Sequence, residues 1–338
     1  GRDCKLCKRR TRKTGGNPMI ARHSRIVDRA LTRLKLRQLR LLVAVGSHGN
    51  IQNAARELGI SQPAATKMIQ DLELDFEVKL FSRTNRGVVP TIFGDTLIKH
   101  GKLIFAQVSN AAQELDDLNE GNSGRVVIGT LLAASTGLLP VAIDILLADR
   151  PKVAIKISEG TNEVLIPALL SGEIDLFVGR LPSHRQLDKI KQEKLFEDRV
   201  VAVVSNQHPL AKKRSVSFEQ TKPFGWILPP LETSLRRQID DFFIGQQQYM
   251  PPLAIESVSY LANRALLQLR DLIGLMPAEV IAQDIENGHL SQLDWIVPFG
   301  QGPIGISYRD DMSLSPAGRA FKQALHQAAQ QRSPSDIR

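Results

Sequence analysis

Apolar residues between positions 36 and 72 recur at the three- and four-residue spacing of amphipathic helices. The first predicted helix has an apolar face formed by Leu36, Leu39, Leu42 and Val43. Asn50 and Ser61 are typical N-cap residues for two further short helices, and Gly59 ends the first of these. Pro63 falls in the first turn of the third helix, where its missing N–H costs no hydrogen bond. Two short helices joined by ELGIS behind a supporting helix are typical of a helix-turn-helix.

The third predicted helix has one apolar and one polar face. Ala65, Ile69 and Leu72 form the apolar stripe. The opposite face carries Gln62, Pro63, Thr66, Lys67 and Gln70. Glutamine pairs with adenine, lysine with guanine or phosphate, and threonine with either of these or with a thymine methyl group. A small polar helix that only faces water is the alternative, but its place as the second helix of a two-helix unit favours DNA reading.

A short polar turn between two apolar segments follows these helices. Leu80 and Phe81 are apolar anchors, Arg83 and Arg86 belong to the turn, and the valines at 88–89 resume a strand. The pattern predicts a small β-wing whose arginines contact phosphates or the minor groove.

The next segment has the spacing of a long helix that begins after Thr91 and runs to about Glu120. Its apolar residues recur in alternating steps of four and three, at Leu97, Gly101, Ile104, Val108, Ala111, Leu115 and Leu118. A heptad seam of this width favours packing against another helix, so we expect dimerisation here. The alternative is a surface helix that lies on its own domain.

From residue 124 onward, apolar strands alternate with helices, which predicts parallel α/β sheets. Two α/β sets follow one another, and PIGISYR then returns the chain to the first. We expect one lobe from 124–198 and 297–330 and a second from 199–296, with a small molecule bound between them. Helix starts and strand ends in such lobes hold ligands. The candidate ligand-binding residues are Thr130, Ser135, Thr136, Thr161, Asn162, Arg180 and Thr233. For each of them the alternative is a helix cap or a surface polar group.

The positive charge is concentrated near the N-terminus. Of the net charge of +9, residues 1–25 hold nine Lys or Arg and one Asp, whereas 124–338 balances at 23 of each sign. This asymmetry is typical of a nucleic-acid-binding head on a body with another task. Residues 1–25 lack apolar periodicity, and three interpretations stay open: a disordered basic arm, an extension upstream of a natural start at Met19, and an arm that contacts DNA.

Several classes of protein find no support in the sequence. No apolar stretch has the length of a membrane helix and no signal-peptide pattern follows the basic start, so we expect a cytoplasmic protein that does not contact the membrane. The two cysteines, Cys4 and Cys7, have no second CxxC or paired histidines nearby to complete a zinc site. Phosphate-binding loops, dinucleotide fingerprints and GxSxG elbows are missing, so we expect neither an enzyme nor a cofactor.

The segment SQPAATKMIQDLE, followed by LFSR, RGV and T-x-x-G, closely resembles the LysR-type transcriptional regulators over about residues 34–329. The resemblance implies a winged helix-turn-helix head that is mainly α, a long linker helix that forms an antiparallel dimer, and an α/β two-lobed, periplasmic-binding-protein-like domain that binds an effector. It implies a homodimer or a homotetramer on double-stranded operator DNA, with contact to RNA polymerase when the regulator activates. The DNA-reading positions carried over are Ser61, Gln62, Pro63, Thr66, Lys67, Arg83 and Arg86. Asn53 departs from the basic residue frequent there, which puts one phosphate contact in doubt.

The expected order is a disordered basic arm (1–30), the head (31–90), the linker helix (91–123), the effector domain (124–330) and a flexible tail (331–338). PFGWILPPLETSLRR and GPIGISYRDDMSLSPAGRAF resemble the branch named for regulators of a galactose-binding protein, which by analogy implies a sugar-type effector.

The competing hypothesis is a solute-binding protein of a transport system, which shares the two-lobed body but has neither head nor wing. An enzyme is the second alternative.

Overall fold

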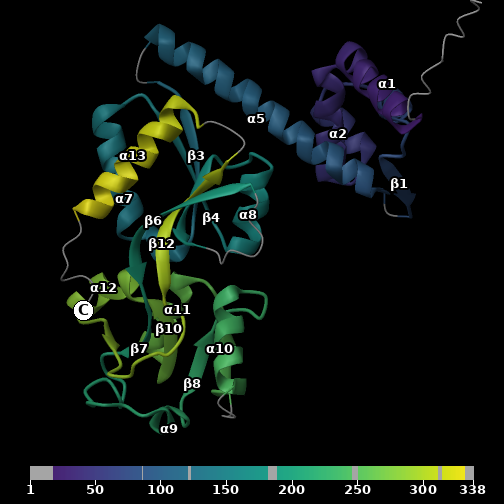
Figure 1. Ribbon diagram of the computed structural model, residues 1–338. Coiled ribbons are helices and arrows are strands. Elements are labelled where there is room, and N and C mark those ends of the chain that lie inside the picture. The colour runs from purple at the N-terminus through teal and green to yellow at the C-terminus, as the bar shows by residue number, and fades with distance from the viewer. Residues whose placement is uncertain are drawn as a thin grey trace, which may run out of the picture. The chain divides into compact units, whose positions relative to one another are not determined.

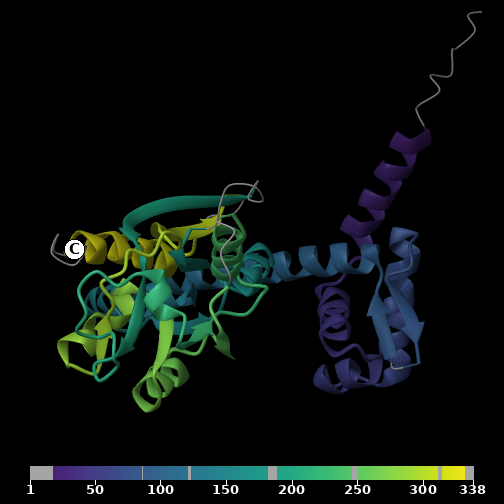
Figure 2. The same ribbon diagram turned by 90° about the horizontal axis from the view of Figure 1, so that it is seen from below.

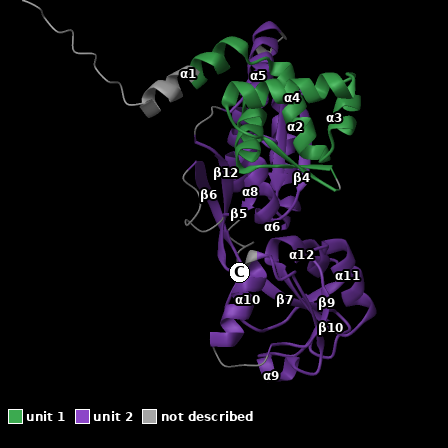
Figure 3. Ribbon diagram, turned by 90° about the vertical axis from the view of Figure 1, so that its right-hand side faces the viewer, with its two compact units in different colours: residues 1–104 green, residues 105–338 purple. Residues whose placement is uncertain are grey.

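The computed structural model describes residues 18–85, 87–120, 123–181, 189–245, 250–310 and 314–331. The chain divides into two compact units, residues 1–104 and 105–338 (Figure 3). Cys4, Cys7, Arg86 and the tail from 332 lie outside the described residues.

The first unit is a helical bundle with a two-stranded wing. Its elements are α1 (Pro18–Arg33), α2 (Leu36–His48), α3 (Ile51–Glu57), α4 (Gln62–Phe76), β1 (Phe81–Thr84), β2 (Gly87–Pro90) and the start of α5 (Ile92–Glu120). The two expected N-caps are confirmed: Asn50 accepts hydrogen bonds from two backbone N–H groups of α3, and Ser61 accepts one from Ala64. Because these caps fix where α3 and α4 begin, they also fix which residues of α4 face outward.

Leucines and alanines of α2, α3 and α4 form the core of this unit. Leu39, Leu42, Ala54, Ala65 and Leu72 are almost fully buried. Leu36 was expected on the same face, but it is 51% exposed because it is the first residue of α2 and lies beyond the other helices.

Helix α1 corrects the expectation that residues up to 30 form an arm without regular structure. Residues 18–33 are helical, and α1 lies against the C-terminal part of α4. Arg29 pairs with Glu77, and Arg33 lies 3.8 Å from Asp75. These ion pairs are partly exposed, so we expect each to contribute little to stability, although together they orient α1 on α4.

Backbone contacts hold the wing on the bundle. The strands β1 and β2 run side by side as an antiparallel pair (Figure 2). The Val88 N–H donates to the Gly49 carbonyl at 2.9 Å. Thr91 closes the wing, since its hydroxyl donates to the Lys79 carbonyl at 2.6 Å and accepts from the Gly94 N–H at 3.1 Å. A side chain at Gly94 would collide with the Leu80 carbonyl, which explains the T-x-x-G spacing.

The second unit contains two five-stranded sheets, each covered by helices (Figure 1). The first lobe comprises β3 (Arg125–Thr130), α6 (Leu132–Ser135), α7 (Leu138–Asp149), β4 (Ala154–Glu159), α8 (Asn162–Leu170), β5 (Leu176–Arg180), β6 (Ile190–Asp198), β12 (Gly302–Arg309) and α13 (Pro316–Gln330). The second comprises β7 (Val200–Ser205), α9 (Phe218–Thr221), β8 (Gly225–Leu228), α10 (Ser234–Gly245), β9 (Leu253–Glu256), α11 (Tyr260–Leu269), β10 (Leu272–Pro277), α12 (Ala278–Glu286) and β11 (Leu290–Gln292).

The sheets are mixed, whereas the alternating pattern predicted parallel ones. The strand orders are β4-β3-β5-β12-β6 and β11-β7-β10-β8-β9. Three neighbouring strands in each sheet are parallel, and the other two pair antiparallel because they enter from or return to the other lobe. The pattern also missed β6, α12 and the short elements α6, α9 and β11. The β6 segment, IKQEKLFED, is a half-exposed edge strand rich in charged residues, so it lacks an apolar alternation.

Two apolar layers stabilise each lobe. In the first lobe, α7 and α13 pack side by side on one face of the sheet, and their Leu146 and Phe321 belong to the same buried cluster (Figure 1). In the second lobe, an aromatic cluster contains Trp226, Trp295 and Phe243, and the centroids of the two indole rings lie 5.8 Å apart. No helix in the described ranges has an apolar stretch long enough to cross a membrane.

The two lobes are joined by two crossing segments, at residues 198–200 and 300–302. They bond to one another, since the Val200 N–H donates to the Gly300 carbonyl at 3.1 Å. Gly300 has a φ of 72°, and a side chain there would collide with Val200. The two crossings are therefore a paired, closely packed hinge.

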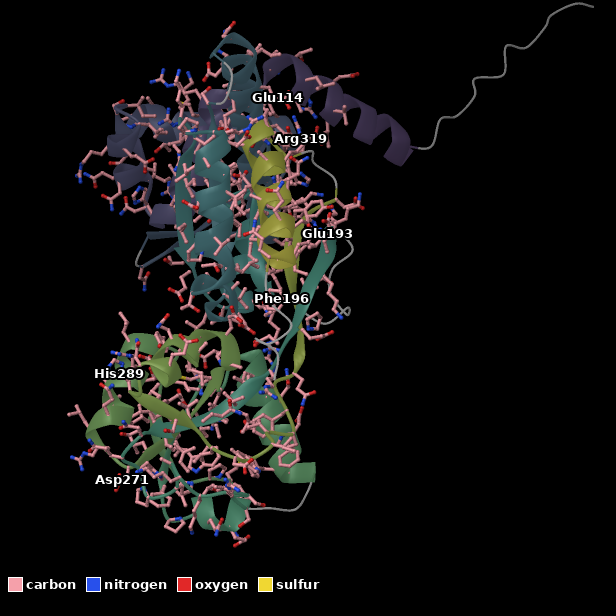
Figure 4. The ribbon with its side chains drawn as sticks, turned by 90° about the vertical axis from the view of Figure 1, so that its left-hand side faces the viewer. Glu114, Glu193, Phe196, Asp271, His289 and Arg319 are labelled. Atoms are coloured by element: carbon pink, nitrogen blue, oxygen red, sulfur yellow. The ribbon has the colours of Figure 1, made fainter. Side chains whose placement is uncertain are left out.

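A polar cluster joins β6 and β12 to α13. Glu193, labelled in Figure 4, accepts hydrogen bonds from Tyr308 at 2.5 Å and Lys322 at 2.8 Å, and its other oxygen lies 2.7 Å from His326 Nε2. Burial raises the pKa of Glu193, but these three hydrogen bonds outweigh it and lower the pKa to about 2.

We expect Glu193→Gln to flatten the acid dependence of stability. Because the folded-state pKa lies below the ordinary value of 4.5, the contribution of Glu193 is complete above that pH and is lost as the pH falls towards 2. Urea midpoints measured by circular dichroism from pH 6 to 3 test this, with Glu286→Gln on the exposed face of α12 as the control. Equal acid dependence in wild type and Glu193→Gln would contradict it.

Candidate DNA-binding surface and ligand-binding cleft

Helix α4 presents its N-terminal half outward. Ala65, Ile69 and Leu72 are buried in the bundle. On the other side Ser61, Gln62, Pro63, Lys67 and Gln70 are exposed, and Thr66 is half-buried. The structure therefore brings all the predicted residues of α4 to one outward face, as their spacing requires.

The electrostatics of this face suit an anion. The first turn of α4 contains no acidic residue, and the positive end of the helix dipole adds to the charge of Lys67. Lys67 has no ion-pair partner within the described parts of the chain, so its charge is available to a phosphate or a guanine.

The wing supplies a second basic position. Arg83 is exposed on β1, opposite Val88 in the strand register. The strand register pairs Thr84 with Gly87 at the end of the wing. Arg86, the other predicted wing residue, lies outside the described residues.

A cavity of about 580 Å³ lies between the two lobes of the second unit. It opens at the carboxyl ends of the parallel strands of both sheets and at the starts of α8 and α11, where α/β proteins usually hold ligands. Six of the predicted residues line it: Ser135, Thr136, Thr161, Asn162, Arg180 and Thr233. Thr130 does not line it; this side chain is buried at the end of β3, and its hydroxyl donates to the Leu131 carbonyl.

Local structure already uses two of these hydroxyl groups. Ser135 donates to the Leu132 carbonyl at 2.9 Å, and Thr233 donates to the Pro230 carbonyl at 2.8 Å. Thr161 is different, because it is the N-cap of α8 and its side chain makes no capping hydrogen bond. Its hydroxyl is the better candidate for a contact with a ligand.

Arg180 fastens the hinge from inside the cleft. Its guanidinium donates to the Asp198 carboxylate at 2.9 Å and to the Gly302 carbonyl at 3.3 Å. Asp198 ends β6 and Gly302 begins β12, so one side chain holds both crossing segments. Burial lowers the pKa of Arg180, and the neighbouring Asp198 opposes that shift.

The sequence analysis missed most of the cleft wall contributed by α11. Ser259, Tyr260 and Asn263 all line the cavity. Ser259 is the N-cap of α11 and follows the strand LAIES, and a helix start after a strand end is the sequence signal that could have identified this position. Nothing in the local pattern distinguished Asn263 from an ordinary polar helix residue.

A charged network supports this wall from behind. Tyr260 donates to the Asp284 carboxylate, and Arg264 Nε lies 2.8 and 2.7 Å from its two oxygens. Burial together with the hydrogen bond to Asp284 raises the pKa of Tyr260 to about 12. The phenol therefore stays protonated, and its hydrogen bond to Asp284 fixes the side chain where it lines the cleft.

One ion pair joins the lobes across the cleft. Arg237 of α10 donates to Glu163 of α8 at 3.1 Å, and Glu163 lines the cavity. Both side chains are partly exposed, so the pair limits the opening of the cleft only weakly.

Two family models match the chain. Residues 36–95 match the bacterial regulatory helix-turn-helix protein of the lysR family, and residues 119–330 match the LysR substrate binding domain. The chain belongs to the LysR family of transcriptional regulators. The predicted fold class and function are thereby confirmed: this LysR-type regulator has a DNA-binding helix-turn-helix head and a two-lobed effector-binding domain.

Curated relatives and solved structures agree with this assignment. The regulator GbpR of Azospirillum brasilense is 33% identical over 88% of this chain and 87% of its own. PcaQ of Agrobacterium fabrum is 29% identical over 88% of this chain and 96% of its own. The structure of CbnR complexed with its target DNA has a TM-score of 0.62 at 19% identity, covering 87% of this chain and 100% of that one. A full-length OxyR variant from Pseudomonas aeruginosa has a TM-score of 0.62 at 20% identity, covering 89% and 96%.

These findings decide between the classes considered from the sequence. The relatives are regulators, so the hypothesis of a transport solute-binding protein is rejected. LysR-type regulators bind DNA and small-molecule effectors and form oligomers.

We expect Gln62→Ala and Lys67→Ala to weaken binding to a preferred duplex by about 1–3 kcal/mol each and to relax base preference, because each removes a contact to a base edge. Arg83→Ala should weaken binding to all duplexes evenly and reduce the salt slope by about one. The measurement is fluorescence anisotropy on a duplex that the full chain selects from a random pool.

Gln283→Ala, in the second lobe, is the matched control for this series. If Gln62→Ala and Lys67→Ala left the preference among duplexes unchanged, the DNA-reading face would have to be assigned elsewhere.

Proposed function

We propose that this LysR-type regulator reads DNA with the outward face of α4 and with the wing, and that a small molecule in the interlobe cleft controls the DNA complex. The observation that carries the second part is Arg180, which lines the cleft and also bonds both hinge segments. A ligand in the cleft therefore touches the one element that can change the arrangement of the lobes.

The reading face consists of Ser61, Gln62, Pro63, Thr66, Lys67 and Gln70, with Arg83 and Arg86 in the wing. The outward position of the six residues of α4 and the exposure of Arg83 support this assignment. The effector contacts are Thr161, Asn162 and Arg180, with Ser135, Thr136 and Thr233 at the edges of the same cleft. The effector is a sugar or a small organic acid, which is the range of sizes that the cavity accommodates.

Helix α5 is the proposed dimerisation element. The C-terminal part of its predicted seam is uncovered by the described residues, since Val108 is 50%, Leu115 63% and Leu118 83% exposed. Gly101, nearer the start of the seam, is instead buried against Val43 of α2. The α5 helix of a second copy would cover the exposed part of the seam and form a homodimer, and two dimers would form a tetramer. Dimerisation places two heads on half-sites about 34–36 Å apart or a multiple of that distance.

Control by the ligand follows from its unequal affinity for two arrangements of the lobes. A ligand shifts an equilibrium only as far as its affinities for the two states differ. Contacts to both lobes provide such a difference, because they form together only in a closed cleft. We further propose that the protein acts on DNA in the cytoplasm and contacts RNA polymerase when it activates; neither role involves catalysis.

We expect Val108→Asp and Leu115→Asp to dissociate the dimer and to reduce DNA affinity sharply, since each buries a charge without a partner in the seam. Sedimentation velocity and anisotropy on the same samples test this. Ser109→Asp is the control, because Ser109 follows Val108 in the sequence but does not belong to the heptad seam; this variant should remain dimeric. An intact dimer in both seam variants would place the interface elsewhere.

We expect Thr161→Val to raise the ligand concentration needed for a response and to leave DNA binding without ligand unchanged. A thermal-shift screen of sugars and organic acids supplies the ligand, since saturation at 100 times Kd adds about 2.7 kcal/mol of stability. Titration of the DNA complex then compares wild type and variant. Loss of DNA binding in ligand-free Thr161→Val would argue against a role limited to the cleft.

A further inference from the structure

Two asparagine side chains, one from each lobe, face the cleft with unpaired carbonyl oxygens. Asn162 is the first residue of α8, and Asn263 lies in the first turn of α11 with 7% of its surface exposed. Both Oδ1 atoms are buried, and neither has a hydrogen-bond partner among the described residues. Both residues line the cavity. A buried carbonyl without a partner is costly, so each position favours a donor from the cleft, either a water molecule or a group of a bound ligand.

The charged side chains of the cleft, considered apart from the N-termini of α8 and α11, do not favour an anionic occupant. Arg180 is the cation among the described lining residues, and it is already bonded to Asp198 and to a backbone carbonyl. Glu163 is neutralised by Arg237, whereas Glu159 lines the cavity and has no ion-pair partner in the described ranges. The net formal charge of these side chains is negative, so they offer a carboxylate ligand no free cation, and only the N-termini of α8 and α11 would favour it.

The amide groups specify the complementary chemistry. An asparagine side chain offers a carbonyl acceptor and an NH₂ donor side by side, and a hydroxyl is an uncharged ligand group that pairs with both, because it donates and accepts. A carboxylate only accepts, and an ammonium only donates. The Glu159 carboxylate can accept a hydrogen bond from a further hydroxyl group of the ligand. The remaining wall is apolar, with Leu131, Val258 and Met276, and suits the C–H faces of a compact ring.

We propose that the cleft binds an uncharged, polyhydroxylated molecule, a sugar or polyol, and that Asn162 and Asn263 bridge it between the two lobes. This inference rests on the proposed function, in which the cleft is the effector site. It chooses the uncharged class over organic acids and assigns the bridging role to a pair of residues, one of which the sequence analysis missed. Because the two amides belong to different lobes, a ligand that pairs with both holds the cleft closed.

The first experiment compares neutral probes with matched anions on the full chain. The neutral probes are D-glucose, D-galactose, L-arabinose and myo-inositol, and the anions are D-gluconate, D-galacturonate and benzoate. Binding is measured by isothermal titration and by the fluorescence of Trp226 and Trp295, which lie in the second lobe. We expect at least one neutral probe to bind and its matched acid to bind about tenfold more weakly or not at all. Binding of the acids without any neutral probe would overturn the proposal.

The second experiment changes the two amides. Asn162→Ala and Asn263→Leu should each lower the affinity for the neutral probe by about tenfold. This is the loss expected when one hydrogen bond worth about 1.4 kcal/mol is removed. Asn263→Leu should leave the melting temperature of the ligand-free chain unchanged or raised, because the unpaired carbonyl disappears. A purely structural asparagine would give the opposite result, a lower melting temperature with unchanged affinity. Asn287→Ala, on the exposed end of α12, is the matched control.

The outcomes separate this inference from the proposed function. If an acid binds in the cleft and alters the DNA complex, the effector site stands and the ligand class is wrong. If a neutral probe binds through both asparagines but leaves the DNA complex unchanged, the ligand class stands and the effector role is wrong. Unchanged affinity for the neutral probe in both Asn162→Ala and Asn263→Leu would show that these two residues do not bridge the ligand.

Discussion

The chain passes between its two lobes twice, and the geometry of the cleft depends on those crossings at 198–200 and 300–302. The segments are hydrogen-bonded to one another through Val200 and Gly300, and Arg180 holds the end of one and the start of the other. Two adjacent strands resist twisting and shearing better than one, but they still allow the lobes to rotate about the line of the pair. A rotation of one lobe against the other about this hinge would open or close the cavity.

Both lobes are organised around that constraint. Each sheet has three parallel strands whose carboxyl ends point to the cavity, and two antiparallel strands that include the ones linked to the hinge. The helices that start at the cleft, α8 and α11, follow strand ends in their own lobes. The side chains on each wall of the cleft thus lie on rigid elements. When the angle between the lobes changes, all the side chains of one wall move together relative to those of the other.

The features that could be predicted from the sequence are those determined by neighbours along the chain. The N-caps at Asn50 and Ser61 and the apolar stripe of α4 depend on spacings of a few residues, and the structure has them where the sequence placed them. The orientation of a residue at a strand end depends on sheet packing, which the local pattern does not contain. For this reason Thr130 was expected in the cleft and is buried beside it, whereas Asn263 was not considered and faces the cavity. Strand β6 was missed because it is a charged, half-exposed edge strand whose sequence lacks an apolar alternation.

Helix α11 shows why the unpaired asparagine indicates a binding role rather than an imperfection of the fold. Tyr260 and Arg264 lie on the same helix within one turn of Asn263, and both are bonded to the buried Asp284 carboxylate. The protein therefore satisfies partly buried polar groups at this place when their role is structural. Asn263 is more deeply buried than Arg264, yet its carbonyl has no partner in the described structure. An unpaired polar atom that also lines a cavity, beside groups that are paired, is a position where a partner from outside the chain fits.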